Sequence, residues 1–328
     1  MRKKGLVERL VMSEPATEDF SPAKFPKNRA KLFKYMLKNK FFKIYKNHWL
    51  ISLFFLPLIA WGVLTMGYTD WMFSLDPKEG IQHLFEYWFT VHVTAIPLWI
   101  IAFLGLAGGL NVLRKLAWSD PVMLKSDFWQ GIKASGKQIS LIGLLFGVAY
   151  SMIRYAMDWL GFYYRVFEAT STAVFGIFVC VILLLVLIGY TAYLVCMSSL
   201  YNVTLKQLLV GAFKLYFADF FMASGTVLLC LIPMLIFVFS DFAILILIGY
   251  FVLLAGLIGF IIIPPFLVCQ HTFDRIINKK DYPDYYGRGL SYGVYAQAVT
   301  EENEKDEVQV NLEEELEDDF ERVNDDEN

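Results

Sequence analysis

The sequence predicts an all-α membrane protein: a polytopic bundle of six transmembrane helices with amphipathic interfacial helices on the cytoplasmic side and both termini in the cytoplasm. Three observations support this fold class. Of the 328 residues, 57% are hydrophobic and 19% are charged, whereas soluble domains carry about 25% charged residues. Several runs of 18 or more residues contain no charge, which is enough to cross a bilayer as a helix. Lys and Arg are also distributed very unevenly between alternate loops. This composition excludes a soluble enzyme and a secreted domain.

Six apolar segments make up a membrane domain over residues 30–280. Helices are expected because the bilayer core offers no hydrogen-bond partner for a free backbone group. Several glycines are expected to allow close contact between helices, and Pro57, Pro97, Pro233, Pro264 and Pro265 can kink the spans. The predicted spans are 50–68, 88–112, 138–160, 173–197, 220–239 and 242–268, and the contact glycines are Gly105, Gly108, Gly109, Gly256 and Gly259.

The charge distribution predicts the orientation of the spans. The two tails and the alternate loops on the same side hold 26 Lys and Arg, whereas the intervening loops hold only Lys78 and Arg165. Because the cytoplasmic side carries the positive excess, both termini are predicted to be cytoplasmic.

Amphipathic segments precede the first, third and fifth spans, at residues 31–44, 128–137 and 205–214. Their apolar residues follow a helical period, so each segment is predicted to lie along the anionic inner leaflet. The second and third segments align at an offset of 80 residues. This alignment indicates a weak internal repeat. The alternative is that any apolar span preceded by a basic segment would align in this way. The residues expected to bind lipid or a partner are Phe128, Trp129, Lys133, Lys206 and Lys214.

The flanking segments differ in character. Residues 1–29 are predicted to be disordered, and residues 281–300, rich in Tyr and Gly, to form an ordered turn-rich segment. Residues 301–328 carry a net charge of −13, which leaves +10 on the rest of the chain. Such an acidic run is expected to stay solvated and disordered, either binding a basic partner or only aiding solubility. The basic residues follow the membrane interface, so nucleic-acid binding is not expected.

Ionisable residues inside a span are costly and mark candidate sites. Arg154 and Asp158 are four residues apart, on one helical face, near the outer end of the third span. His83 and Glu86 lead into the second span. These four residues form a predicted outer polar pocket. The alternatives are a self-paired interfacial anchor for Arg154 and Asp158 and a polar helix rim for His83 and Glu86. His92 does not lie cleanly on the same face, so no metal site is predicted.

The sequence carries no signature of catalysis. It lacks the GxxxxGK[ST] phosphate loop, HExxH, GxSxG and the kinase motifs. Cys180, Cys196, Cys230 and Cys269 have no CxxC spacing and all lie in or beside apolar runs, so neither a disulfide nor a zinc site is expected. The chain is therefore predicted to be non-enzymatic, with no metal and no cofactor.

Two cytoplasmic boxes resemble the YesL-type family of bacterial multi-pass membrane proteins. They are Ser126–Lys133, with the sequence SDFWQGIK, and Tyr201–Phe213, with the sequence YNVTLKQLLVGAF. The resemblance covers roughly residues 30–280 and implies a protein of the bacterial plasma membrane associated with carbohydrate uptake. The family has no established catalytic residues to transfer. The extended N-terminus, the long first external loop and the acidic tail depart from its pattern.

Together, these features predict an accessory or scaffolding membrane protein of a solute-uptake system, such as one for carbohydrate. Its expected partners are anionic inner-leaflet lipids and transporter subunits, and its oligomeric state is left open. The alternative is a small secondary transporter or channel that uses the outer polar pocket. An intramembrane enzyme acting on lipid has no supporting motif.

Overall fold

The computed structural model describes residues 25–73, 77–167, 170–238 and 243–292, and every regular element within them is a helix. Among these residues, five helices are long and apolar enough to cross a membrane, or six if the bent pair α7 and α8 forms one span. The predicted all-α, multi-pass class is confirmed at this level. The main helices are α2 (Arg29–Asn39), α3 (Phe41–Phe73), α4 (Pro77–Trp118), α5 (Leu124–Phe167), α6 (Thr170–Leu200), α7 (Leu205–Ala218) and α8 (Phe220–Val238).

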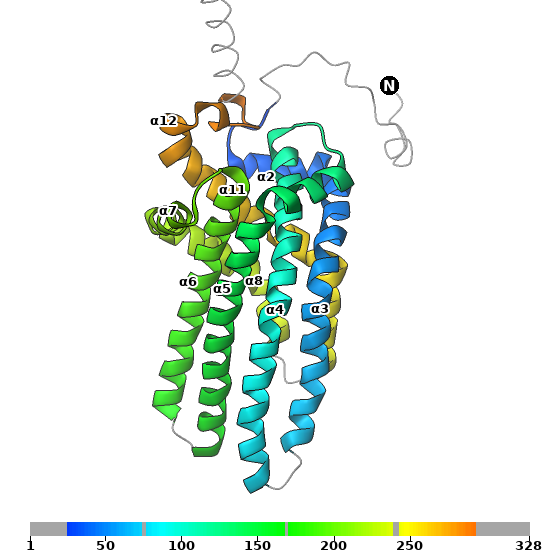
Figure 1. Cartoon of the computed structure of the whole chain (residues 1–328), viewed down its shortest axis with the longest axis vertical. Coiled ribbons are helices and arrows are strands. Elements are labelled where there is room, and N and C mark those ends of the chain that lie inside the picture. Colours follow the sequence, from blue (N-terminus) through cyan, green and yellow to red (C-terminus); the bar gives the residue numbers. More distant parts are fainter. Residues whose placement is uncertain (1–24, 74–76, 168–169, 239–242, 293–328) are drawn as a thin grey trace, which may run out of the picture.

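Helices α3 to α6 run side by side along the long axis of the molecule (Figure 1). The first four predicted spans lie inside these helices. Close packing of α4 depends on glycine, as predicted. A Cβ on Gly109 would lie 2.4 Å from the Ile51 side chain, and one on Gly108 would lie 2.8 Å from the Phe128 ring.

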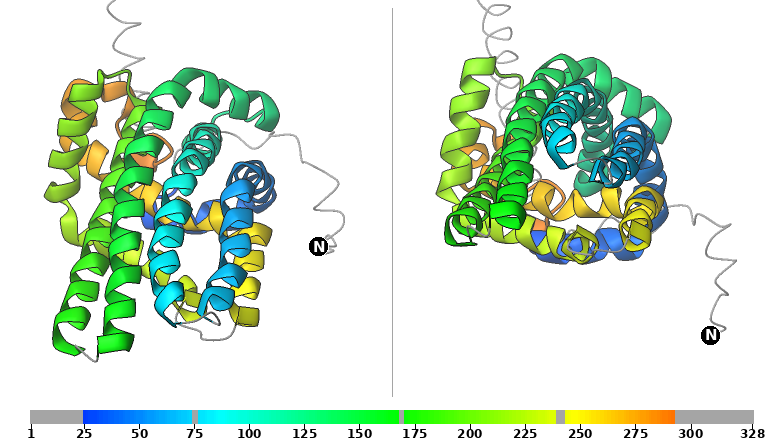
Figure 2. Two further views of the ribbon diagram at one scale, coloured as in Figure 1. Left: turned by 60° about the horizontal axis from the view of Figure 1, so that its bottom comes forward. Right: turned by 90° about the horizontal axis from the view of Figure 1, so that it is seen from below.

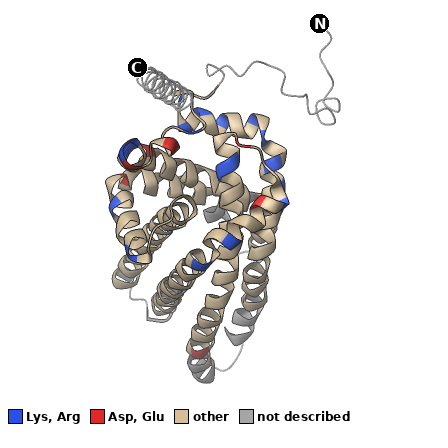
Figure 3. Ribbon diagram, turned by 45° about the horizontal axis from the view of Figure 1, so that its top comes forward, with Lys and Arg blue, Asp and Glu red and all other residues tan. Residues whose placement is uncertain are grey.

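One end of the bundle is covered by helices that cross its axis. Helix α2 lies across this end (Figure 1), and the start of α5 curves over it (Figure 2). Helix α7 meets α8 at an angle of 88°. We call this the capped end, and the opposite end, where α3 meets α4 and α5 meets α6, the far end. Lys and Arg gather at the capped end (Figure 3).

The two ends of the described chain are joined at the capped end. Arg29 Nη2 donates to Asp274 Oδ2 at 2.6 Å, with both side chains buried. Asp274 Oδ1 also accepts from Asn278 Nδ2 at 2.9 Å and from the Gly287 backbone N–H at 3.2 Å. The segment predicted to be disordered, residues 1–29, overlaps the described residues at positions 25–29. The Asn28 side chain accepts from Lys31 N and so caps α2, and Arg29 is then fixed by its buried partner.

The sixth predicted span, 242–268, is not one regular helix. It divides into α9 (Ala243–Val252), a π-helical turn η2 (Leu253–Leu257), α10 (Ile258–Ile261) and α11 (Ile263–Phe273). The fully buried imidazole of His48 lies at the break. Its Nδ1 accepts from the Gly259 N–H at 3.1 Å, and its Nε2 lies 2.9 Å from the Leu254 carbonyl. Pro264 and Pro265 follow, and proline adds a further break because it lacks the backbone donor.

The amphipathic segments use their apolar faces differently from the prediction. In the first, Leu32, Met36 and Ile44 are buried against the rest of the protein. Phe128, predicted to be interfacial, is 1% exposed and packs on Phe54 and α4. That prediction is wrong because the start of α5 bends back onto the bundle.

The predicted internal repeat is matched only in part. Residues 205–214 form a separate helix, α7, with a capping box between Thr204 and Gln207. Residues 128–137 instead belong to the continuous 44-residue helix α5. The two boxes therefore differ in how each joins the helix that follows.

After α11 the chain continues through η3 (Asp274–Asn278), α12 (Lys279–Asp281) and the 3-10 turn η4 (Pro283–Tyr285). Tyr282 and Tyr285 pack on Tyr201, and Tyr285 also packs on Trp118. Gly289 has a φ of 76°, and a Cβ there would lie 2.1 Å from the Ala117 carbonyl oxygen. The predicted turn-rich segment is therefore ordered as far as Tyr292, and residues 293–328 lie outside the described residues, as do residues 1–24.

Candidate functional site

A cavity of about 670 Å³ lies between α3, α4, α5 and the broken segment from α9 to α10. Its volume falls within the range of about 300–1,000 Å³ that is usual for small-molecule sites. Arg154, Asp158 and Gly161 from the second half of α5 line it, which places it toward the far end.

Two walls of the cavity come from single faces of the two longest helices, α4 and α5. Trp88, His92, Ala95 and Trp99 contribute from α4, at spacings of three and four residues. On α5 the contributing residues are Tyr150, Arg154, Met157, Asp158 and Gly161. Because residues three and four apart share a helical face, each helix turns one continuous stripe toward the cavity.

Three ionisable side chains meet in the cavity. Asp158 Oδ2 lies 2.7 Å from His92 Nε2, and Asp158 Oδ1 accepts from Arg154 Nη2 at 3.2 Å. The carboxylate therefore holds the imidazole more closely than the guanidinium. The Ser151 hydroxyl donates to the His92 backbone carbonyl at 2.8 Å, which ties the two helices together at this level.

Aromatic rings form a large part of the cavity wall: Phe55, Trp61, Tyr87, Trp88, Trp99 and Phe162. Two of these residues form hydrogen bonds between α3 and α4 through their polar groups. Trp61 Nε1 donates to the Val91 carbonyl at 3.2 Å, and the Tyr87 hydroxyl donates to the Thr65 carbonyl at 2.6 Å. These bonds fix the rings in place and leave their apolar faces toward the cavity.

Two tyrosines line the cavity near Arg154. Tyr150 and Tyr250 both lie close enough to Arg154 to interact with it electrostatically. Trp99 Nε1 is buried and has no acceptor among the described residues. Because this nitrogen has no exposed surface, it does not face the cavity.

The predicted outer polar pocket is divided by the structure. Arg154 and Asp158 pair with each other and line the cavity, whereas His83 and Glu86 do not line it. His83 Nδ1 lies 3.8 Å from Glu86 Oε2 with the side chains 60% and 67% exposed, which matches the alternative of a polar helix rim.

His92, which the sequence analysis set aside, completes the cluster instead. The sequence pattern that could have identified His92 is the aromatic and polar stripe on α4, because His92 shares the face of Trp88 and Trp99. The same helix presents His83 and Glu86 on another side.

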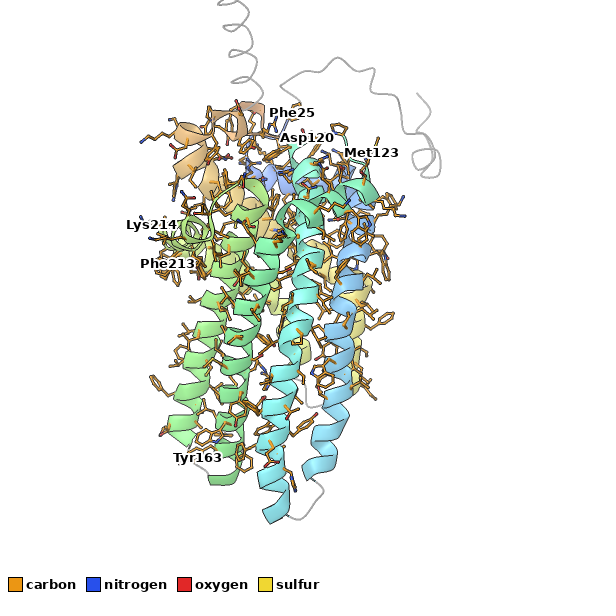
Figure 4. The ribbon with its side chains drawn as sticks, viewed as in Figure 1. Phe25, Asp120, Met123, Tyr163, Phe213 and Lys214 are labelled. Carbon is orange, nitrogen blue, oxygen red and sulfur yellow. The ribbon has the colours of Figure 1, made fainter. Side chains whose placement is uncertain are left out.

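The predicted lipid- or partner-binding residues other than Phe128 lie on the surface. Trp129 is 49% exposed, and Lys133, Lys206 and Lys214 are also exposed. Figure 4 shows Phe213 and Lys214 on α7 at the outer side of the bundle, where the Phe213 ring also contacts Tyr190 of α6. Within the described residues, no group of three or more His, Cys, Asp and Glu is arranged to hold a metal ion.

No family model, no curated protein and no solved structure matches this chain. The resemblance to the YesL-type family therefore stays a prediction.

Proposed function

We propose that the protein is a small membrane carrier that binds a polar solute in the cavity lined by His92, Arg154 and Asp158. The observation that carries this proposal is an interhelical cavity that contains three ionisable side chains within otherwise apolar helices. Ionisable groups at such positions commonly mark the path of a substrate or ion. The alternative raised by the sequence, a transporter with an outer polar site, is thus preferred to the accessory role.

The position of the cavity supports access from outside the cell. With the basic capped end in the cytoplasm, Lys137 lies near the inner interface. Arg154 is 17 residues further along α5, about 25 Å at 1.5 Å per residue. A hydrocarbon core of about 30 Å then places Arg154 near the outer interface, where water and solute can enter.

The broken helix beside the cavity supports a binding role. Leu253 of η2 and Ile258 of α10 line the cavity, and Tyr250 lies one turn before the break. In many transporters, discontinuous helices form the substrate site. We propose this role for the segment from α9 to α10.

The accessibility of the cavity can be tested with engineered cysteines. In a background with the four native cysteines replaced by Ala, Met157→Cys lies on the cavity wall and Met152→Cys lies on the outer, 69% exposed surface of the same helix. A charged, membrane-impermeant methanethiosulfonate added outside intact cells is expected to label Met157→Cys and not Met152→Cys, because only the cavity holds water. Failure to label Met157→Cys would exclude a solvent-accessible site, and the carrier proposal with it.

The accessory role is a second candidate, favoured by the exposed surface of α7 at the capped end. Lys206 and Lys214 are exposed there, and the helix lies across the axis of the bundle. Purification in a mild detergent followed by mass spectrometry tests it. A stoichiometric transporter subunit in the eluate would support this role, and a protein that elutes alone would contradict it.

The wider setting remains part of the proposal. A bacterial plasma membrane, both termini in the cytoplasm and anionic inner-leaflet lipids as partners are consistent with the charge asymmetry along the chain. We also propose that the protein is not an enzyme, since its sequence contains none of the catalytic motifs sought.

A further inference from the structure

We infer that the solute is an organic monocarboxylate with an aromatic or bulky apolar body, bound through Arg154; this inference rests on the proposed function of the cavity. It depends on three properties of the cavity wall: an excess of hydrogen-bond donors, the charge balance, and the aromatic surface.

The donors exceed the acceptors among the described polar side chains. Among the described residues, Asp158 is the only carboxylate on the wall, and it already uses one oxygen for His92 and the other for Arg154. Arg154 donates one hydrogen bond, to Asp158, and a guanidinium has five N–H groups. A ligand that brings acceptor oxygens satisfies the remaining N–H groups of Arg154.

The charge balance at Arg154 leaves room for an anion, because its pairing with Asp158 is weak. The 3.2 Å contact from Arg154 to Asp158 is long for a charge-assisted hydrogen bond, whereas the 2.7 Å contact from His92 is of ordinary length. Asp158 therefore keeps His92 as its closer partner while the planar fork of Arg154 binds a second carboxylate.

The surface around Arg154 selects the rest of the ligand. Tyr150 lies on the same wall as Arg154 and interacts with it electrostatically, and the rings of Phe55, Trp88, Trp99 and Phe162 form apolar walls. Trp99 makes edge-to-face contacts with Phe146 and Tyr150 at centroid distances of 4.8 and 4.9 Å, which hold the indole ring in a fixed position. A flat or bulky apolar body fits such a wall, and a sugar with many hydroxyl donors does not.

The experiment compares three probes of the same shape and different charge. Benzoate, benzamide and benzamidinium are tested for protection of Met157→Cys against the charged methanethiosulfonate, with the protein in nanodiscs. We expect benzoate to slow labelling and the other two to leave the rate unchanged. Arg154→Gln is expected to raise the benzoate concentration that gives half-maximal protection by about tenfold or more, because the variant loses a charge-assisted hydrogen bond to the carboxylate.

Two controls address misfolding. Thermal unfolding and elution from a sizing column check that Arg154→Gln is folded. Arg275→Gln removes an exposed cation at the capped end and should leave protection unchanged.

The outcomes separate this inference from the proposed function. If Met157→Cys is labelled but benzoate gives no protection, or benzamide or benzamidinium protects equally well, the carboxylate inference is overturned and the accessible cavity stands. If Met157→Cys is never labelled, the proposed function fails first.

Discussion

At the scale of single residues, Asp158 has two roles that oppose each other. It holds His92 in position, and it competes with an incoming carboxylate for Arg154. The same contact that stabilises the empty cavity therefore weakens binding of an anion.

Asp158→Asn tests this competition. Removing the negative charge frees Arg154, so benzoate is expected to protect Met157→Cys at a several-fold lower concentration than in the parent. The melting temperature should fall, because Arg154 loses its only described ionic partner. A variant that binds benzoate as poorly as Arg154→Gln would show instead that Asp158 positions Arg154 for the ligand.

Lys40 provides a pH-dependent element at the capped end. Its Nζ donates to the Leu116 carbonyl at 2.7 Å and to Ser119 Oγ at 3.0 Å, at the C-terminal end of α4. Burial, with a smaller contribution from Lys43, lowers the pKa of Lys40 from 10.5 to about 8. The folded state thus binds fewer protons than the unfolded state between these two values, and stability should rise with pH in that window.

The expected result is a higher melting temperature in detergent at about pH 9.5 than at about pH 7.5, with a smaller rise in Lys40→Met. This pH range stops short of tyrosine ionisation. Burial raises the pKa of Tyr201, so above the ordinary pKa of tyrosine this group makes stability fall as the pH rises. Equal rises in the two proteins would assign the effect to other groups.

Sequence alone identified part of the site for a physical reason. Arg154 and Asp158 share one helix, so their four-residue spacing fixes their proximity. His92 reaches Asp158 across 66 residues of sequence, and such a contact depends on how α4 and α5 rotate against each other.

At the scale of helices, the break between α9 and α10 is made by a residue of α3. The His48 ring supplies an acceptor to the Gly259 N–H and a donor to the Leu254 carbonyl, two groups that a regular helix would pair differently. The helix can therefore depart from α geometry without leaving these backbone groups unpaired.

Two glycines in this segment allow a matched test of the close approach. A Cβ at Gly259 would lie 2.4 Å from the His48 Cβ, whereas a Cβ at Gly256 would meet nothing within 4 Å. Gly259→Ala is expected to destabilise the protein by about 1–3 kcal/mol through overpacking. Gly256→Ala is expected to be neutral or slightly stabilising. Thermal unfolding of the two variants measures the difference, and equal melting temperatures would contradict this packing.

Hydropathy located the first four of the six predicted spans because α3 to α6 are regular helices whose apolar length is sufficient to cross a bilayer. It also marked the apolar run 242–268, but not its break. The prolines showed where a kink was possible, while the contact with His48 comes from more than 200 residues earlier in the chain.

At the scale of the whole molecule, the capped end ties the first and last described helices together. Arg29 of α2 binds both Asp274 and the carbonyl of Arg288. Asp219, at the corner between α7 and α8, accepts from Thr272 and Arg275 at 2.6 Å each. These bonds make the segment after α11 an integral part of the fold.

The two ion pairs differ in burial and so in expected cost. Arg29→Ala leaves Asp274 charged and buried, and we expect a loss of about 3–5 kcal/mol in the free energy of unfolding. Arg275→Ala is expected to cost about 0–1 kcal/mol, because Arg275 is 52% exposed and Asp219 keeps Thr272. Arg29→Met combined with Asp274→Leu should recover much of the loss, since no unpaired charge remains. Denaturant titration in detergent measures all three, and a mild effect of Arg29→Ala would contradict the role of the buried pair.

The general organisation of this end was visible in the sequence, and its packing was not. Charge counts predicted a basic side, and turn residues predicted order after residue 281. Arg29 lies in a region of mixed composition, and only its contact with Asp274, 245 residues away, brings it into the core.

The backbone N–H of Ser291 donates to the carbonyl of Pro26 at 3.1 Å, so both tails leave the folded body from a single point. Two fragments of a split fluorescent reporter, fused one to each terminus, would start from neighbouring anchors at a high effective concentration. Their reassembly should then be independent of dilution, and loss of signal would follow local release of α2. Such a fusion would report, in living cells, on whether the capped end stays closed while the cavity at the other end is filled.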